Sequence, residues 1–247
     1  MVLAQRYVPH YEKIMANRTV MYCMVKNSSS VVLLLHGGYP SSRATRGFLV
    51  DYGRIFNTTV CGVDYSLSGF GGKEVGDVVN AVRFWKKKGK RVAVLGKSHG
   101  GYLALLAATM EKCDAVVSIA GPTDLLSMGE FSLERPELPL AFSPLMALTV
   151  RECGGIPEEN PGCYMQRSPF YRASFIKCPV LLIHGIQDDV VPVTQAYEME
   201  GALEASGKTY EVLYVNGTHL EIEKKEKVVE KVCEFMQKYV GEACESD

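Results

Sequence analysis

The sequence has no long uninterrupted apolar run. A membrane-spanning helix needs about 20 consecutive apolar residues, and no segment of this chain approaches that length. The first residues, 1–14, include Arg6, Glu12 and Lys13 and lack the apolar centre of a secretion signal. We therefore expect a cytoplasmic protein without a membrane span.

The chain also lacks a marked excess of charge of either sign. Lys and Arg number 27 and Asp and Glu number 28, so the formal net charge is -1. A chain with so little net charge has no long-range attraction for a polyanion. We therefore expect no nucleic-acid partner.

Paired Cys-x-x-Cys spacings are missing, although the chain has 8 cysteines. Such pairs are the usual sequence sign of a zinc site, so we predict no bound metal. We interpret most of the cysteines as small buried hydrophobic residues, because the cytosol keeps thiols reduced. Cys153 and Cys163 lie on either side of a loop with Gly and Pro. They are the one pair that we would test for a disulfide.

Predicted strands and helices alternate along most of the chain. The predicted strands are residues 19–25, 31–35, 58–63, 92–95, 115–119, 180–184 and 210–215. The predicted helices are residues 74–88, a helix that ends near residue 110, 193–206 and 221–240. This alternation predicts an α/β fold with a mainly parallel sheet and helices on both faces.

Residues 121–175 interrupt the alternation. They are rich in Pro and Gly and contain an apolar stretch at 138–150. We interpret them as an insertion within a single domain of residues 1–247, a length that suits one α/β domain. The apolar stretch has two open interpretations, a lid over a substrate pocket or a helix that fills the core beneath a long loop.

Residues 96–101, Gly-Lys-Ser-His-Gly-Gly, stand between a predicted strand and a predicted helix. In this context Gly-x-Ser-x-Gly is the nucleophile-elbow motif. The residues two before and two after the serine must be small so that strand and helix can approach, and Gly96 and Gly100 meet this need. The helix N-terminus points free N–H groups toward the reacting oxygen. We predict that Ser98 is a catalytic nucleophile.

A serine hydroxyl needs a base to become nucleophilic. His219 follows the last predicted strand, and the elbow motif has the chain order serine, acid, histidine. The acid should follow the strand of residues 180–184, where Asp188 and Asp189 are both candidates. It would hold the imidazole in the correct tautomer and stabilise its cation. Asp124 is a more distant alternative.

The oxyanion of the intermediate needs hydrogen-bond donors. One predicted donor is the backbone N–H of His99, the residue after the nucleophile. The other should come from residues 36–39, His-Gly-Gly-Tyr, which follow an early strand. Gly38 is our choice because it has no side chain to obstruct the substrate oxygen, and Tyr39 is the alternate.

Together these motifs resemble the catalytic domain of the prolyl oligopeptidase family of serine peptidases, which has the α/β-hydrolase fold. The resemblance covers most of residues 31–240 and is most specific at 179–192, Pro-Val-Leu-Leu-Ile-His-Gly through Val-Pro. In the family pattern the acid stands four residues after the histidine of this motif. The resemblance therefore selects Asp188 as the acid, and the closing histidine matches His219.

The sequence departs from the family pattern in two respects. The family peptidases usually carry a large N-terminal β-propeller, whereas about 30 residues precede the first core strand here. We therefore expect the catalytic domain without the propeller. Leu220 and Glu221 follow the closing histidine, where the family usually has Gly or an aromatic residue nearby. The resemblance thus implies the triad but not the peptide specificity.

We predict a serine hydrolase, a carboxylesterase or acyl hydrolase, that cleaves carboxylic esters through an acyl-enzyme without a metal or organic cofactor. Its partner would be a small ester or a short peptide. An oligopeptidase or acylaminopeptidase is the alternative, weakly disfavoured because no cluster of Glu or Arg clearly suits a peptide amino terminus. A non-catalytic binding protein is the second alternative, and the complete triad argues against it. Nothing in the sequence favours one oligomeric state.

Overall fold

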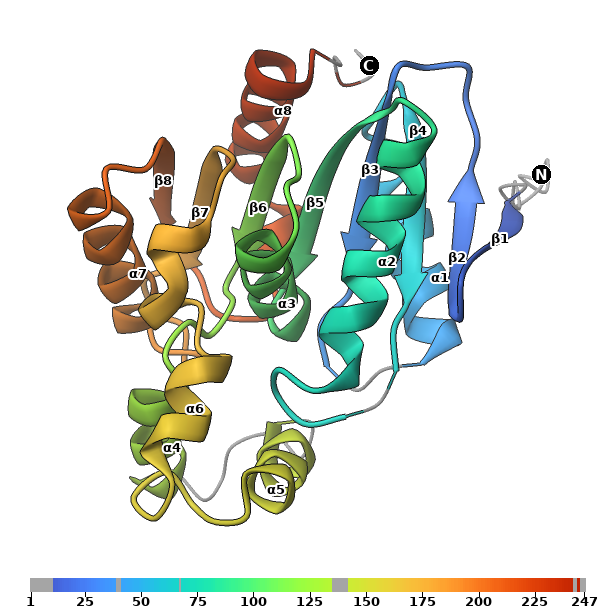
Figure 1. Cartoon of the computed structure of the whole chain (residues 1–247). Helices are drawn as coiled ribbons and strands as arrows, with labels where there is room; N and C mark the ends of the chain where they lie inside the picture. Colours follow the sequence, from blue (N-terminus) through green and yellow to red (C-terminus); the bar gives the residue numbers. More distant parts are fainter. Residues whose placement is uncertain (1–10, 39–40, 67, 135–141, 242–243, 245–247) are drawn as a thin grey trace, which may run out of the picture.

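A mixed sheet of eight strands runs through the centre of the molecule (Figure 1). The computed structural model describes residues 11–38, 41–66, 68–134, 142–241 and 244. The strand order is β1-β2-β4-β3-β5-β6-β7-β8. The strands are β1 (Glu12–Ala16), β2 (Thr19–Met24), β3 (Ser30–Leu35), β4 (Thr59–Asp64), β5 (Arg91–Lys97), β6 (Ala115–Ile119), β7 (Val180–Gly185) and β8 (Tyr210–Val215). From β4 to β8 neighbouring strands are parallel, and β2 and β1 add antiparallel pairs at one edge.

Helices cover both faces of the sheet, which confirms the predicted α/β fold. α1 (Ser42–Tyr52) and α8 (Glu226–Val240) pack on one face. α2 (Lys73–Lys87), α3 (His99–Met110) and α7 (Thr194–Ala205) pack on the other.

The central strand β3 shows why apolar runs form this core. Val31 and Leu33 point into the hydrophobic cluster on one face, whereas Val32 and Leu34 point into the cluster on the other. Side chains alternate across a strand, so a strand covered on both faces has an unbroken apolar sequence. Its carboxyl end, like those of β5 and β7, lies at the edge of the sheet where the predicted site residues follow.

Outside residues 121–175 three elements differ from the prediction, and one of them is β1, where no strand was expected. α1 was not expected; its buried residues Thr45, Leu49 and Tyr52 lie on one stripe, and Ser41 caps its first turn by accepting a hydrogen bond from the N–H of Ala44. The final helix begins at Glu226 rather than at 221, because a short 3₁₀ turn, η2 (Ile222–Lys224), precedes it.

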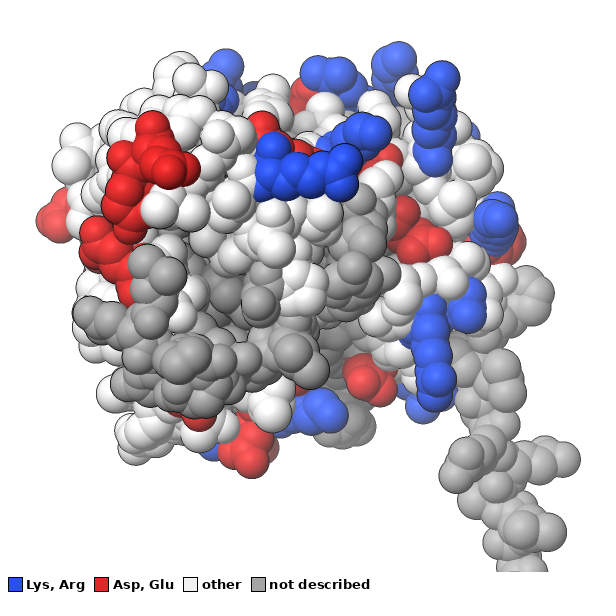
Figure 2. All heavy atoms as spheres, turned by 90° about the horizontal axis from the view of Figure 1, so that it is seen from below, with Lys and Arg blue, Asp and Glu red and all other residues white. Residues whose placement is uncertain are grey.

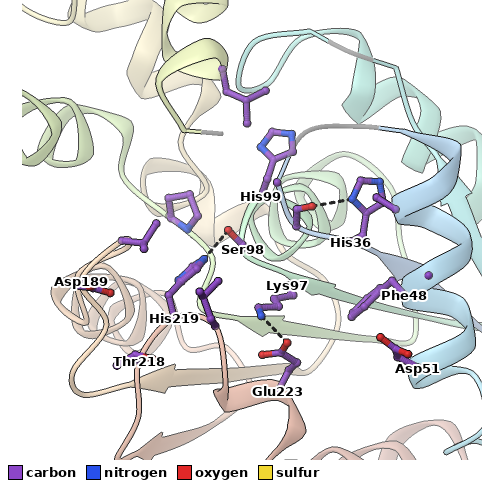
Figure 3. A pocket seen from close by; sticks show the side chains of 18 of the residues that line it. His36, Phe48, Asp51, Lys97, Ser98, His99, Asp189, Thr218, His219 and Glu223 are labelled. Carbon is purple, nitrogen blue, oxygen red and sulfur yellow. Dashed lines mark hydrogen bonds and ion pairs between the residues drawn. The ribbon is translucent and has the colours of Figure 1, made fainter. Parts of the chain in front are cut away.

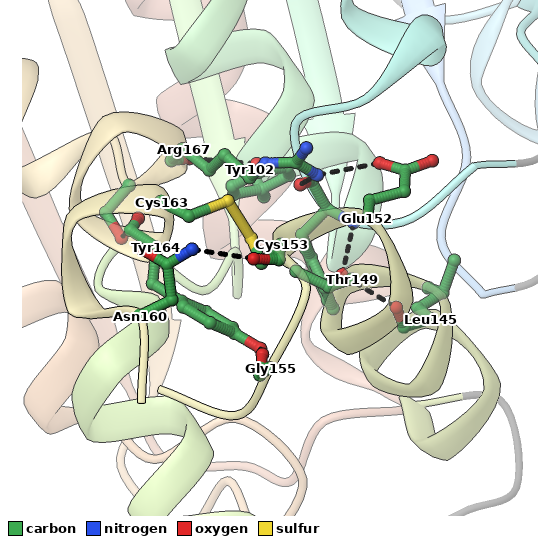
Figure 4. Close-up of a disulfide and its surroundings, with 12 residues drawn as sticks. Tyr102, Leu145, Thr149, Glu152, Cys153, Gly155, Asn160, Cys163, Tyr164 and Arg167 are labelled. Carbon is green, nitrogen blue, oxygen red and sulfur yellow. Dashed lines mark hydrogen bonds and ion pairs between the residues drawn. A yellow bond between two sulfur atoms is a disulfide. The ribbon is translucent and has the colours of Figure 1, made fainter. Parts of the chain in front are cut away.

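The segment between β6 and β7 gathers helices at one end of the sheet, at the bottom of Figure 1. They are α4 (Leu125–Glu134), α5 (Phe142–Cys153), α6 (Pro161–Arg167) and the 3₁₀ turn η1 (Phe170–Phe175). A disulfide between Cys153 and Cys163 joins α5 to α6 (Figure 4). Beside it, Glu152 and Arg167 form an ion pair of 2.7 Å. Of the apolar stretch 138–150, residues 138–141 lie outside the described residues.

The interpretation of most cysteines as small buried hydrophobic residues missed their pairing, because three disulfides use six of them. The pair singled out from the sequence, Cys153–Cys163, is bonded, and so are Cys23–Cys61 and Cys233–Cys244. Cys23 and Cys61 are 38 residues apart and stand directly opposite each other on antiparallel strands β2 and β4. Only the sheet register brings them together, so their spacing in the sequence gives no sign of the bond.

Charged side chains of both signs occur on the face seen from below, and Lys and Arg do not form a continuous patch there (Figure 2). Among the described residues no helix is long and apolar enough to cross a membrane. In the same part of the chain no group of three or more His, Cys, Asp and Glu side chains could hold a metal ion.

Candidate active site

Ser98 stands at the sharp turn between β5 and α3, with φ 54° and ψ -122°. A positive φ is uncommon for a residue with a side chain and is typical of strained functional turns. The glycines around it have no room for a Cβ. One on Gly96 would lie 2.0 Å from the backbone oxygen of Gly100, and one on Gly100 would lie 2.0 Å from that of Leu35. The predicted steric role of these glycines therefore agrees with the geometry.

Gly100→Ala is expected to destabilise the fold by about 3 kcal/mol or more, because the new methyl group has to displace backbone rather than a side chain. Gly76→Ala in α2 is the matched control. Gly76 is exposed and a Cβ there would meet no atom within 4 Å, so alanine should stabilise the helix by about 0.5–1 kcal/mol. Urea unfolding of both variants measures the difference. Equal stability of the two variants would contradict the packing argument.

His219 bridges Ser98 and Asp188. Its Nε2 lies 2.9 Å from Oγ of Ser98, and its Nδ1 lies 2.7 Å from Oδ2 of Asp188. His219 comes from the loop after β8 and Ser98 from the turn after β5 (Figure 3), and Asp188 comes from the loop after β7. The structure therefore brings the three predicted residues into one hydrogen-bonded chain at the carboxyl ends of parallel strands.

Asp188 is held by the backbone as well as by His219. Its Oδ1 accepts hydrogen bonds from the N–H groups of Val190 and Val191, at 3.0 and 2.9 Å. Asp188 is buried, whereas Asp189 is exposed. His184 lies behind the carboxylate, 3.5 Å from its Oδ2, and burial lowers the pKa of this histidine.

The distant alternative acid, Asp124, lies at the start of α4 and, among the described residues, forms no hydrogen bond with His219. Its Oδ1 accepts from the N–H of Leu126 at 2.9 Å, and its Oδ2 accepts from the hydroxyl of Tyr171 at 3.3 Å. These contacts are those of a residue that caps a helix. Burial raises the pKa of Asp124.

Gly38 and His99, the two predicted oxyanion donors, both line the cleft beside Ser98. Gly38 has a φ of +71°, which favours glycine. His99 is the first residue of α3, where backbone N–H groups have no partner within the helix. Gly37 passes so close to the nucleophile that a Cβ on it would lie 2.9 Å from Cβ of Ser98. Tyr39, the alternate donor, lies outside the described residues.

The side chain of His99 is buried in an aromatic cluster and points away from the triad. Its ring contacts Phe70, Tyr102 and Tyr65, with centroids 5.0, 5.6 and 5.8 Å away. Neither ring nitrogen has a hydrogen-bond partner among the described residues. Burial, with the nearby His36, lowers the pKa of His99 to about 3.

This neutral histidine should make stability depend on pH. Its pKa is lower in the folded chain than the ordinary histidine pKa of 6.5, so its contribution to stability is present above that pH and is lost as the pH falls toward 3. His99→Phe should therefore lose less free energy of unfolding between pH 7 and pH 4 than the wild type. Denaturant titrations of both proteins between pH 7 and pH 4 measure the free energy of unfolding.

Glu74 provides the control of opposite sign, since burial raises its pKa to about 7. It gains a proton in the folded chain first, so it adds stability as the pH falls. Between pH 7 and pH 4, Glu74→Gln should therefore lose more free energy of unfolding than the wild type, whereas His99→Phe should lose less. Parallel curves for all three proteins would contradict both assignments.

A cleft of about 680 Å³ surrounds Ser98 (Figure 3). One wall is a face of α1, which the sequence did not predict as a helix; Ala44, Gly47, Phe48 and Asp51 lie on it. The serine cap at Ser41 and the spacing of the buried residues were the available signals. Lys97 and Glu223 also line the cleft, and the sequence predicted no role for either residue. The remaining lining residues are His36, Gly37, Gly38, Phe70, Ser98, His99, Pro122, Leu145, Asp189, Val190, Thr218, His219 and Leu220.

A serine, a histidine and an aspartate form a hydrogen-bonded chain on an eight-stranded sheet, and the serine stands at a strand-to-helix turn. These features define a serine hydrolase of the α/β-hydrolase fold. Residues 67–243 match the model of the prolyl oligopeptidase family, Peptidase_S9. The chain belongs to this family, as the sequence motifs predicted.

Curated relatives are longer than the chain. It is 31% identical over 151 residues to the uncharacterized peptidase YtmA of Bacillus subtilis, a match that covers 59% of this chain and 55% of that protein. It is also 31% identical to dipeptidyl aminopeptidase BIII of Pseudoxanthomonas mexicana, over 73% of this chain and 26% of the relative. The matches thus span about half and about a quarter of these relatives.

Solved structures share the fold at lower identity. A puromycin-hydrolyzing peptidase of Mycobacterium tuberculosis superposes with a TM-score of 0.72 at 23% identity, over 94% of this chain and 39% of that one. A truncated carbohydrate esterase from gut microbiota superposes with a TM-score of 0.75 at 16% identity, over 92% of each chain. The fold is therefore shared by peptidases and esterases.

Proposed function

We propose that this serine hydrolase cleaves short peptides, with Ser98, His219 and Asp188 as its catalytic triad. The observation that supports it best is the hydrogen-bonded chain of these residues within the segment that matches a peptidase family. The named relatives include a dipeptidyl aminopeptidase and an acylamino-acid-releasing enzyme of Mus musculus. This choice differs from the ester preference drawn from the sequence, and the family membership is the reason.

The geometry supports a two-step acyl transfer. Oγ of Ser98 attacks the carbonyl carbon while Nε2 of His219 accepts its proton. Asp188 keeps the proton on Nδ1 of His219 and stabilises the imidazolium. The N–H groups of His99 and Gly38 bind the oxyanion. His219 then protonates the leaving amine, and a water activated by the same histidine releases the acid from Ser98.

The lining of the cleft suits a substrate with both polar and apolar parts. Asp51 and Asp189 bring exposed carboxylates to it, and the amide and amino groups of a peptide offer partners for them. Carboxylic esters are the second candidate, because apolar residues also line the cleft. They are Phe48, Phe70, Pro122, Leu145, Val190 and Leu220.

We also propose that residues 121–175 form a cap within a single domain of 1–247. Pro122 and Leu145 of this segment line the cleft beside Ser98. Leu145 is buried on α5. This helix contains the described part of the apolar stretch, so the stretch would serve as the wall of a substrate site rather than only as core filling.

A substrate panel tests the choice between peptide and ester. It contains p-nitroanilides of amino acids and dipeptides, with free and with acetylated amino ends, and p-nitrophenyl acetate and butyrate. We expect release of nitroaniline that Ser98→Ala abolishes. Ester cleavage alone is the result that would reject the peptide proposal and favour a carboxylesterase. Ester cleavage beside anilide cleavage supports it, since the same acyl-enzyme forms from both.

A further inference from the structure

Lys97 and Glu223 form a buried ion pair between the segments that carry Ser98 and His219. Nζ of Lys97 lies 2.6 Å from Oε1 of Glu223, and the two side chains are 12% and 10% exposed. Lys97 directly precedes Ser98, and Glu223 stands four residues after His219, in η2. Figure 3 shows the pair next to the contact between Ser98 and His219, below it in this view, and both residues line the cleft.

Glu223 depends on Lys97 for charge neutralisation. Its Oε2 is buried and has no hydrogen-bond partner among the described residues. The hydroxyl of Tyr52 in α1 donates to its backbone oxygen at 2.5 Å, which fixes the main chain of η2. A buried charge that loses its only partner is strongly unfavourable. Each side chain of the pair therefore holds the other in place, and the pair joins β5 to the loop of His219.

We propose that Lys97 and Glu223 are positioning residues that fix His219 against Ser98 and keep the charge beside them balanced. The proposal rests on the proposed catalytic roles of Ser98 and His219. His219 becomes a cation when it accepts the serine proton. A lone Lys97 cation would oppose that charge and a lone Glu223 carboxylate would favour it, whereas the intact pair does neither.

Opposite shifts of the pH profile are the signature of this charge balance. Glu223→Gln leaves the lysine alone, so the acid-side midpoint of kcat/KM should move to lower pH by about half a unit or more at low salt. Lys97→Met leaves the carboxylate alone, and the midpoint should move to higher pH. The double variant removes both charges and should return to the wild-type midpoint.

The other charges near His219 are the same in all these variants. His219 is bonded to Asp188, and the exposed carboxylates of Asp189 and Asp51 line the same cleft. The buried histidines nearby have pKa values that burial lowers. They are His184, His36 and His99. Differences between the profiles therefore report on the pair itself.

Controls separate charge balance from general damage. Glu221→Gln and Lys87→Met remove the same charges at exposed positions and should leave the midpoint unchanged. Lys97→Arg keeps the charge and should keep the midpoint even if kcat falls. Shifts of both single variants in the same direction, or no shift in either, would overturn the proposal. If the wild type does not react with a fluorophosphonate probe, the proposed function fails instead.

A separate observation concerns the two cysteines outside the three disulfides. The sulfur atoms of Cys113 and Cys178 lie 2.9 Å apart, and both residues are buried. They precede the adjacent parallel strands β6 and β7, which hydrogen bonds such as that from the N–H of Val116 to the oxygen of Pro179 hold together. A disulfide bond needs about 2.0 Å between its sulfurs, so the two sulfur atoms already lie near bonding distance.

We infer that Cys113 and Cys178 form a fourth disulfide. The two thiols lose two protons and two electrons, which reduce a disulfide of a thiol–disulfide oxidoreductase or a small disulfide compound to two thiols. The bond would join two residues 65 positions apart and enclose the whole cap segment between them. Alkylation in denaturant without reductant, followed by peptide mass mapping, should find these two residues linked. Alkylation of Cys113 and Cys178, whether or not the six cysteines of the other disulfides are also alkylated, would overturn the inference.

Discussion

Ser98→Ala should lower kcat by about 10⁵-fold or more while leaving the fold intact. Removal of a triad nucleophile leaves only what substrate binding and the oxyanion donors contribute. Among the described residues Oγ of Ser98 has one hydrogen-bond partner, Nε2 of His219, so the change breaks one side-chain hydrogen bond. Assays with the best substrate of the panel measure kcat, and circular dichroism checks the fold.

Labelling with a fluorophosphonate gives a second readout for the same residue. The wild type should react at Ser98, and the alanine variant should not react. Ser174→Ala is the control, because Ser174 is an exposed serine in the cap segment and its removal should leave labelling and turnover unchanged. Residual turnover at the wild-type level in Ser98→Ala would assign the chemistry to another group and remove the basis of the proposed mechanism.

The strands of the core could be predicted because burial on both faces shows directly in the sequence. Two predicted strands, 115–119 and 210–215, have the bounds of β6 and β8. α1 was not predicted, because Arg43, Arg46 and Gly47 interrupt its apolar positions and glycine is a poor helix former. Its tertiary contacts stabilise it more than its own sequence does.

The triad could be proposed from the sequence because each member follows a strand in a fixed chain order. The choice of Asp188 over Asp189 needed the family pattern, and in the structure Asp188 is the one that contacts His219. Lys97 and Glu223 could not be paired in this way. They lie 126 positions apart by residue number, and nothing in the sequence distinguishes them from the many charged residues on the surface. Only the fold brings them together.

Asp188→Asn should lower kcat by about 10⁴-fold with little change in stability, as expected for loss of the orienting acid in a triad. An asparagine side chain can place its N–H₂ group toward Nδ1 of His219. The imidazole then carries its proton on Nε2 and can no longer accept one from Ser98. The amide oxygen can still accept from the N–H groups of Val190 and Val191, as Oδ1 of Asp188 does now. A pre-steady-state burst assay measures the acylation step directly.

Asp189→Asn is the matched control, because it makes the same change one residue along the same loop. Asp189 is exposed, so kcat should stay within about twofold of the wild type, as for surface substitutions in general. Its side chain lines the cleft, so KM for a positively charged substrate would rise if that carboxylate binds it. If Asp189→Asn rather than Asp188→Asn abolished turnover, the hydrogen bond to His219 would not identify the catalytic acid. The family pattern that selected Asp188 would then be misleading in this chain.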